Sequence, residues 1–227
     1  MSTCAVELRT ADVALTLANS VLGNLIVAGQ APALLWDGEL RPYCHAAPIL
    51  ALDHELWLPH MSRSLPRGIY TLDATLDGLV PKSLPAQVIA GEQIRIRRIP
   101  AIVRAQVSPF VVQERIESWA AERCGKVKYN LGGLWGFLPR FIMGNLPAEA
   151  LSAALATVCS EETSLAVREA VRSVIDPETG WPYDPVPWRA CKWTAPTHLG
   201  NRRARLENLT TTLGDTVWYL EPKHLAS

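Results

Sequence analysis

The sequence predicts an α+β protein, because short strand patterns are followed by longer helical ones. The strand patterns are apolar or alternating runs at Ala46–Leu52 and Gln93–Ile99. The helical patterns lie further along the chain, at Gln113–Cys124 and Ser160–Val174. The chain has 227 residues, of which 48% are hydrophobic, so it can bury a substantial core. We therefore expect one domain spanning residues 1–227.

The N-terminal part predicts a strand, a helix and a loop in that order. Residues 12–18 alternate weakly between polar and apolar side chains, and Val21–Ala28 is an apolar run that we expect to form a short helix. Residues 29–42 contain several glycines and prolines, which is typical of a loop.

Strands dominate the next stretch of the chain. We expect Ala46–Leu52 and Glu55–Leu58 to be strands, with a tight turn at Asp53-His54 between them. Residues 64–92 are interrupted by glycines and prolines, which favours short strands and loops. Gln93–Ile99 alternates apolar and basic residues with the period of a strand.

Helices dominate the later part. Gln113–Cys124 places Ile116 and Trp119 on one face, and Gly125 is a typical helix stop. A short helix opening with proline is expected at Pro147–Thr157. The strongest helical pattern is Ser160–Val174. Its apolar stripe consists of Leu165, Val167, Ala170, Val171 and Val174.

Charge and cysteine content exclude several classes of protein. The 22 basic and 22 acidic residues cancel, so electrostatics gives no reason to expect nucleic acid as a partner. We interpret the basic run Arg95-Ile96-Arg97-Arg98 as a solvated strand face. Five cysteines without a C-x-x-C pair favour neither a disulfide framework nor a zinc site, and we expect no cofactor or metal. The odd number indicates synthesis in a reducing compartment.

Targeting signals are not recognisable in the sequence. Residues 1–10 include charged side chains and lack the apolar core of a signal peptide. No apolar run approaches the roughly 18 residues needed to span a bilayer. We expect a chain that is cytoplasmic as synthesised, without a membrane span.

Cys159 and His45 are the candidate catalytic residues. Cys159 directly precedes the helix expected from Ser160, and backbone N–H groups at a helix start favour a thiolate. His45 lies at the start of an expected strand, and an imidazolium beside the thiol would lower its pKa further. Such a pair is the chemistry of a cysteine nucleophile with a histidine base. The alternative for each is a structural residue, since free cysteine is often a small buried hydrophobe.

Five segments resemble, in order, the motifs of circularly permuted NlpC-type papain-like hydrolases. They are Ala11-Asp12-Val13-Ala14-Leu15-Thr16, Pro42-Tyr43-Cys44-His45-Ala46-Ala47, Glu122–Tyr129 with Gly133–Phe137, Cys159-Ser160-Glu161, and Ala195-Pro196-Thr197-His198-Leu199. In this family the histidine precedes the cysteine, the reverse of papain. The resemblance implies a permuted papain-like fold with an antiparallel sheet packed against the helix that bears the nucleophile.

The chain departs from the family pattern at three places. Ala11 stands where glycine is usual, and Glu162-Thr163 stands where two apolar residues usually follow the nucleophile motif. His198 replaces the usual aspartate.

The resemblance also suggests a third catalytic member about fifteen residues after the histidine. His60 lies nearest to that place, so a Cys159–His45–His60 set is expected, with His54 and Glu55 as alternatives. Tyr129 resembles a cleft tyrosine that could stabilise an oxyanion, and a core position is the alternative.

The resulting functional hypothesis is a cysteine hydrolase acting on amide or peptide bonds. By resemblance, the substrate is a peptidoglycan peptide. A lipid-directed acyl hydrolase or acyltransferase is the first alternative. A non-catalytic module, such as a phage tail-tip component that associates with other tail proteins, is the second. Action on cell wall would require association with a virion or delivery to the periplasm.

Overall fold

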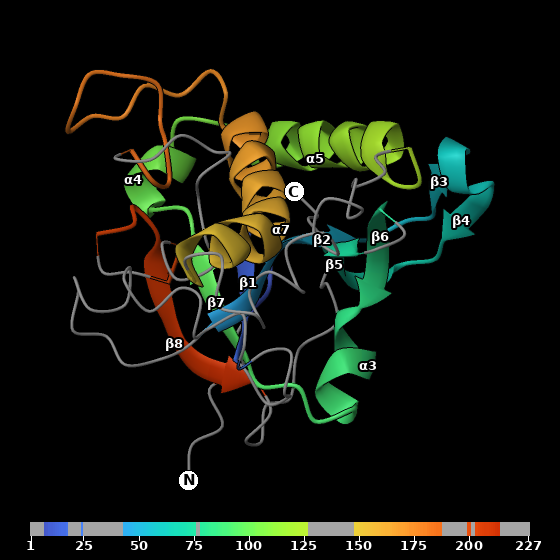
Figure 1. Cartoon of the computed structure of the whole chain (residues 1–227). Helices are drawn as coiled ribbons and strands as arrows, with labels where there is room; N and C mark the ends of the chain where they lie inside the picture. Colours follow the sequence, from blue (N-terminus) through green and yellow to red (C-terminus); the bar gives the residue numbers. More distant parts are fainter. Residues whose placement is uncertain are drawn as a thin grey trace, which may run out of the picture.

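The computed structural model describes residues 7–17, 24, 43–75, 78–126, 148–187, 199–200 and 203–213. Side chains are described for these residues outside 148–158 and 210–213. The expected helix Val21–Ala28 and the loop at residues 29–42 lie almost wholly outside the described residues. The described chain is a mixed α+β structure with an antiparallel sheet and few helices, as the sequence predicts at that level (Figure 1).

Six strands form the main sheet, in the spatial order β6-β5-β2-β1-β7-β8. Every neighbouring pair is antiparallel. The strands are β1 (Val13–Leu17), β2 (Tyr43–Leu52), β5 (Gly68–Thr75), β6 (Gly78–Ser83), β7 (Ile94–Arg98) and β8 (Glu207–Leu213). A separate hairpin pairs β3 (Leu56–Leu58) with β4 (Arg63–Leu65), and the short 3-10 helix η1 (Pro59–Met61) connects them.

Two long helices pack together on the sheet. They are α5 (Pro109–Arg123) and α7 (Ala148–Ala170), and α7 contacts β2 and β5 as well as α5 (Figure 1). The shorter helices are α3 (Leu84–Ile89) and α4 (Ala101–Arg104).

The buried residues form two clusters on opposite faces of the sheet. Val13 and Leu15 belong to the larger cluster, which also contains α5 and α7 residues, whereas Ala14 belongs to the smaller one beside Leu84 of α3. Successive side chains of a strand point to opposite faces, so the two clusters lie on the two sides of β1.

The predicted strands are present, but their pairing differs from a simple hairpin. Ala46–Leu52 lies within β2, Glu55–Leu58 contains β3, and Gln93–Ile99 contains β7. β2 does not pair with β3. It pairs with β1 and β5, while β3 pairs with β4.

The predicted helix Gln113–Cys124 is confirmed and begins four residues earlier, at Pro109. Ser108 caps its N-terminus by accepting the backbone N–H of Phe110 at 3.3 Å. At its other end Gly125 has φ +77°, the left-handed conformation that favours glycine after a helix.

We expect Gly125→Ala to destabilise the fold by about 2 kcal/mol or more. A Cβ at this position would lie 2.6 Å from Met61 Cγ and 3.0 Å from the carbonyl oxygen of His60, and the positive φ adds strain. Urea unfolding measures the effect. Gly91→Ala is the matched control, because Gly91 also has positive φ but no atom within 4 Å of the added Cβ. An equal loss of stability in both variants would mean that the contact of residue 125 with η1 does not cause the effect.

The basic run at residues 95–98 is not a solvated face, so that interpretation is wrong. Arg97 and Arg98 are 2% and 8% exposed. Arg98 donates to Asp12 through Nε at 2.7 Å, and Arg97 donates to the carbonyl of Leu199 at 2.6 Å. Buried charges are tolerated when paired, and these arginines tie β7 to segments distant in the sequence.

Candidate active site

His45 lies near the start of β2, where the strand is irregular. It pairs with Thr16 of β1, and the register shifts between this pair and the next, Leu17 with Tyr43. The shift leaves Cys44 as an extra residue in β2. Such bulges reorient neighbouring side chains and are frequent beside functional sites.

Cys159 lies inside α7, so the expectation that a helix begins just after it is wrong. α7 runs without interruption from Ala148 to Ala170 and joins the two helices that the sequence suggested separately. Residues 148–158 are rich in alanine and leucine and contain neither glycine nor proline, so nothing in the sequence breaks the helix. The helix dipole acts only within the terminal turns and therefore gives Cys159 little support.

The Cys159 side chain nevertheless meets groups that favour its thiolate. Burial opposes the charged form, but the charge of His45 and a hydrogen bond with it outweigh burial and lower the pKa of Cys159. The backbone N–H of Ala46 and the hydroxyl of Ser160 also donate to the sulfur, and the Ser160 Oγ lies 3.8 Å from Sγ. The sequence-predicted pair of Cys159 and His45 thus meets in the structure.

The imidazole of His45 is held between two anionic groups. Burial opposes the imidazolium, but the charges of Cys159 and Asp73 raise the pKa of His45 well above its usual value. The Nε2 atom faces Asp73 Oδ1 at 3.5 Å, which leaves Nδ1 for the thiol. Nε2 is fully buried, while the side chain as a whole is 25% exposed.

Asp73 of β5 is a site residue that sequence reasoning missed. Its side chain is 3% exposed. Burial alone would raise the pKa of this carboxyl, but His45, Lys82 and Thr71 together outweigh burial and lower it. At 3.5 Å the Asp73–His45 contact is an ion pair that falls outside hydrogen-bond geometry. Catalytic contacts are often long in ligand-free structures and shorten when substrate binds. One signal was available: aspartate is uncommon within an apolar strand such as Leu72-Asp73-Ala74, and a buried carboxylate needs a partner.

Asp73 has further partners on its outer side. Lys82 of β6 contacts Oδ2 at 3.0 Å, and the hydroxyl of Thr71 donates to the same carboxylate. Gln87 of α3 in turn donates to Thr71 Oγ1 at 2.7 Å. Thr71 and Gln87 are both buried, so this chain of contacts fixes the carboxylate from behind.

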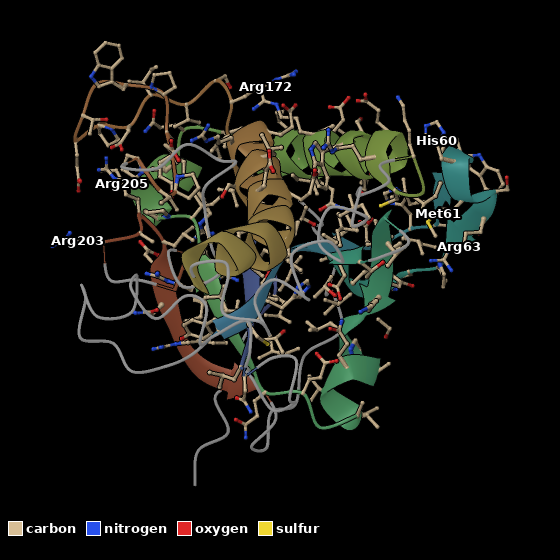
Figure 2. All side chains as sticks on the ribbon, viewed as in Figure 1. His60, Met61, Arg63, Arg172, Arg203 and Arg205 are labelled. Carbon is tan, nitrogen blue, oxygen red and sulfur yellow. The ribbon has the colours of Figure 1, made fainter. Side chains whose placement is uncertain are left out.

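His60 is not brought to His45 by the described contacts. It is an exposed residue of η1, at the hairpin end of the molecule beside Met61 (Figure 2). Its backbone packs against Gly125 at the end of α5. His54 is exposed too and pairs with Asp53 at 2.6 Å and Glu117 at 3.4 Å. Asp73 therefore occupies the place beside His45 that the family resemblance assigned to His60. Tyr129 lies outside the described residues.

α7 is anchored by the residue that directly follows the nucleophile motif. Glu162 is buried and forms a bidentate pair with Arg123 of α5, with distances of 2.6 and 2.9 Å. The Arg123 guanidinium also lies over the Trp119 ring, 5.4 Å from its centroid. This pair accounts for the polar residue at 162 and holds the helix that carries Cys159 against α5.

The other described cysteines do not share these properties. Burial raises the pKa of Cys44, whose thiol donates to the carbonyl of Thr16 at 3.6 Å. Burial likewise raises the pKa of Cys124 to about 12. Both thiols are therefore protonated at neutral pH, and their pKa values are shifted in the opposite direction from that of Cys159.

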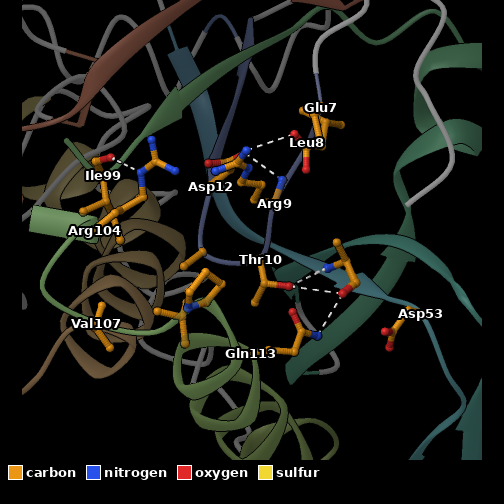
Figure 3. Close-up of a pocket in the computed structure, with 14 residues that line it drawn as sticks. Glu7, Leu8, Arg9, Thr10, Asp12, Asp53, Ile99, Arg104, Val107 and Gln113 are labelled. Atoms are coloured by element: carbon orange, nitrogen blue, oxygen red, sulfur yellow. Dashed lines mark hydrogen bonds and ion pairs between the residues drawn. The ribbon is translucent and has the colours of Figure 1, made fainter. Parts of the chain in front are cut away.

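A well-formed apolar cavity lies elsewhere in the molecule. It has a volume of about 110 Å³ and is lined by the 7–12 segment, Ala51 and Asp53, and residues of α4 and α5 (Figure 3). Ala51 is six residues from His45 along β2, about 20 Å at the rise of a strand. The cavity therefore belongs to the opposite end of β2 and plays no part in the Cys159–His45 contact.

Within the described ranges, no group of three or more histidine, cysteine, aspartate or glutamate side chains is arranged to hold a metal ion. A helix able to span a lipid bilayer is likewise not found in the described part of the chain. No protein-family model matches the chain, and no curated protein sequence matches it.

Proposed function

We propose that this protein is a cysteine hydrolase with Cys159 as nucleophile, His45 as general base and acid, and Asp73 as the residue that orients His45. One observation carries the proposal. Three elements distant in the sequence, α7, β2 and β5, bring together a thiol with lowered pKa, an imidazole and a buried carboxylate. Perturbed groups in such an arrangement are typical of active sites.

The geometry supports a two-step acyl transfer. The Cys159 thiolate attacks a carbonyl carbon, and the imidazolium of His45 gives its proton to the leaving amine or alkoxide, which completes the acyl-enzyme. His45 then removes a proton from water, which attacks the thioester and releases the thiolate. Asp73 holds the ring by Nε2, so that Nδ1 serves the sulfur and the leaving group.

We infer a permuted papain-like fold from the order and placement of these elements. The histidine strand precedes the nucleophile helix in the chain, and α7 packs on the antiparallel sheet beside β2. Ala11 adds support, because it adopts φ +70° at the position where the similar family usually has glycine. Assigning the third position of the site to Asp73 instead of His60 leaves the assignments of Cys159 and His45 unchanged.

A peptide bond in peptidoglycan is the substrate we favour, on the resemblance of the five motifs. The partners would be stem peptides, and tail proteins if the chain belongs to a phage. Such a substrate lies outside the cytoplasm, so action on it implies virion association or delivery to the periplasm.

The test is digestion of purified peptidoglycan by the full chain, with the released fragments analysed by mass spectrometry. We expect new amino termini within stem peptides and none with Cys159→Ser. Release of fatty acid from ester lipids, with peptidoglycan left intact, would replace the substrate by an acyl lipid. Inactivity on both, together with an ordinary Cys159 thiol, would favour a non-catalytic module.

A further inference from the structure

Lys82 and His45 share a single buried carboxylate. Lys82 Nζ lies 3.0 Å from Asp73 Oδ2, while His45 Nε2 lies 3.5 Å from Oδ1. The Asp73 side chain is 3% exposed, whereas that of Lys82 is 47% exposed. The lysine thus reaches in from the surface of β6 and takes the shorter of the two contacts.

The register of the sheet sets this contact. Lys82 pairs directly with Thr71, so its side chain stands on the same face as Thr71 and diagonal to Asp73, within reach of a long side chain. Thr71 is itself held by Gln87. Asp73 therefore cannot turn freely towards His45, and its charge is divided between two cations.

Dividing the charge has a chemical consequence for His45. A carboxylate that pairs only with the imidazolium would hold its proton more tightly and oppose its transfer to a leaving group. A second cation at the same carboxylate weakens this hold by its opposing field.

We propose that Lys82 is a positioning residue that shares Asp73 with His45 and thereby sets how readily the imidazolium releases its proton. The inference rests on the proposed function, since it gives Lys82 a part in the same acid–base step. Lys82 therefore has a role in the site, in addition to being a charged residue at the edge of the sheet.

Other ionisable groups face this part of the site. Glu92, which follows α3, has its pKa raised by burial and by Asp73, and Lys82 and His45 act against that rise. Cys44 and Cys159 also interact with the charge of His45. The test must therefore read His45 itself, because an overall pH profile mixes all of these groups.

The experiment is an NMR titration of the His45 ring in the full chain, with His45→Ala used to assign its signals. In Lys82→Met we expect the His45 pKa to rise by about half a pH unit or more, because loss of a cation favours protonation. Lys82→Arg keeps the charge and should titrate like the wild type. Lys126→Met is the matched control, since it removes a lysine that pairs with Glu122 on α5.

An unchanged His45 titration in Lys82→Met would overturn the inference. A rise of the His45 pKa that is equally large in Lys82→Arg would overturn it too, because arginine keeps the positive charge. Both outcomes leave the proposed function standing if His45 in the wild type titrates well above its ordinary range. An ordinary wild-type titration would instead contradict the proposed function itself. A fall of the His45 pKa in Lys82→Met would overturn the inference as well, because it would show Asp73 turning away from the ring.

Discussion

Replacing His45 with alanine is expected to slow alkylation of Cys159 by iodoacetamide at pH 6 at least tenfold and to abolish any turnover. The imidazolium is the main group that lowers the pKa of Cys159, and without it only the weaker hydrogen bonds from Ala46 and Ser160 oppose burial, so the pKa of the thiol rises. Each unit by which the pKa of Cys159 rises removes up to nine tenths of the remaining thiolate. A more basic thiolate is intrinsically more nucleophilic, which recovers part of this loss. We therefore expect only a tenfold slowing of alkylation as a lower bound.

The rate is measured by mass spectrometry of the alkylated Cys159 peptide in native protein. Cys44→Ala serves as the control, because Cys44 neighbours the histidine but its own thiol is protonated by burial. Equal alkylation rates in wild type and His45→Ala would mean that the two residues do not form an ion pair.

Replacing Asp73 with asparagine is expected to lower the free energy of unfolding by about 2 kcal/mol at neutral pH. The change leaves the imidazolium and Lys82 without the carboxylate between them. The pKa of Asp73 is lowered in the folded protein, so its stabilisation is present above the unfolded value of about 3.9. It is lost as the pH falls below that value, and the wild type and the variant should converge there.

The pKa of His45 is shifted in the opposite direction, so its contribution has the opposite pH dependence. Because that pKa is raised, its stabilisation is complete below about pH 6.5 and is lost as the pH rises through the folded value. Urea unfolding over a pH series measures both effects.

His60→Ala is the matched comparison for Asp73→Asn. His60 is exposed on η1, so its removal should change neither stability nor the reactivity of Cys159 by a measurable amount. If His60→Ala slows alkylation of Cys159 while Asp73→Asn does not, the third catalytic residue would be His60, as the family resemblance suggested.

The main secondary structure could be predicted from local patterns, and the third site residue could not. Alternation and amphipathic spacing are properties of neighbouring residues, so they predict β7 and α5 within a few positions. The position of Asp73 beside His45 depends on β5 pairing with β2, a contact between distant segments. The family resemblance pointed instead to His60, which lies in η1 and not in a strand paired with β2.

The burial of Arg97 and Arg98 could not be predicted from neighbouring residues either. Arg97 and Arg98 look like a solvated face because charged side chains usually are exposed. Their acceptors, the carbonyls of Leu199 and Leu206 and the carboxylate of Asp12, come from both ends of the chain. The helix across Cys159 was missed for a different reason: a motif typical of a helix start outweighed an alanine-rich segment that continues the helix.

The central claim is that contact with His45 lowers the pKa of the Cys159 thiol in the native protein. The most direct measurement is the ultraviolet absorbance of the thiolate across a pH series, taken as the difference between wild type and Cys159→Ser. This measurement needs no reagent to reach the buried sulfur, which is 5% exposed as a residue. We predict a thiolate signal that appears at a clearly lower pH than for an ordinary thiol, because the pKa of Cys159 is lowered. A signal that appears only near the reference thiol pKa of about 8.5, or above it, would contradict the account.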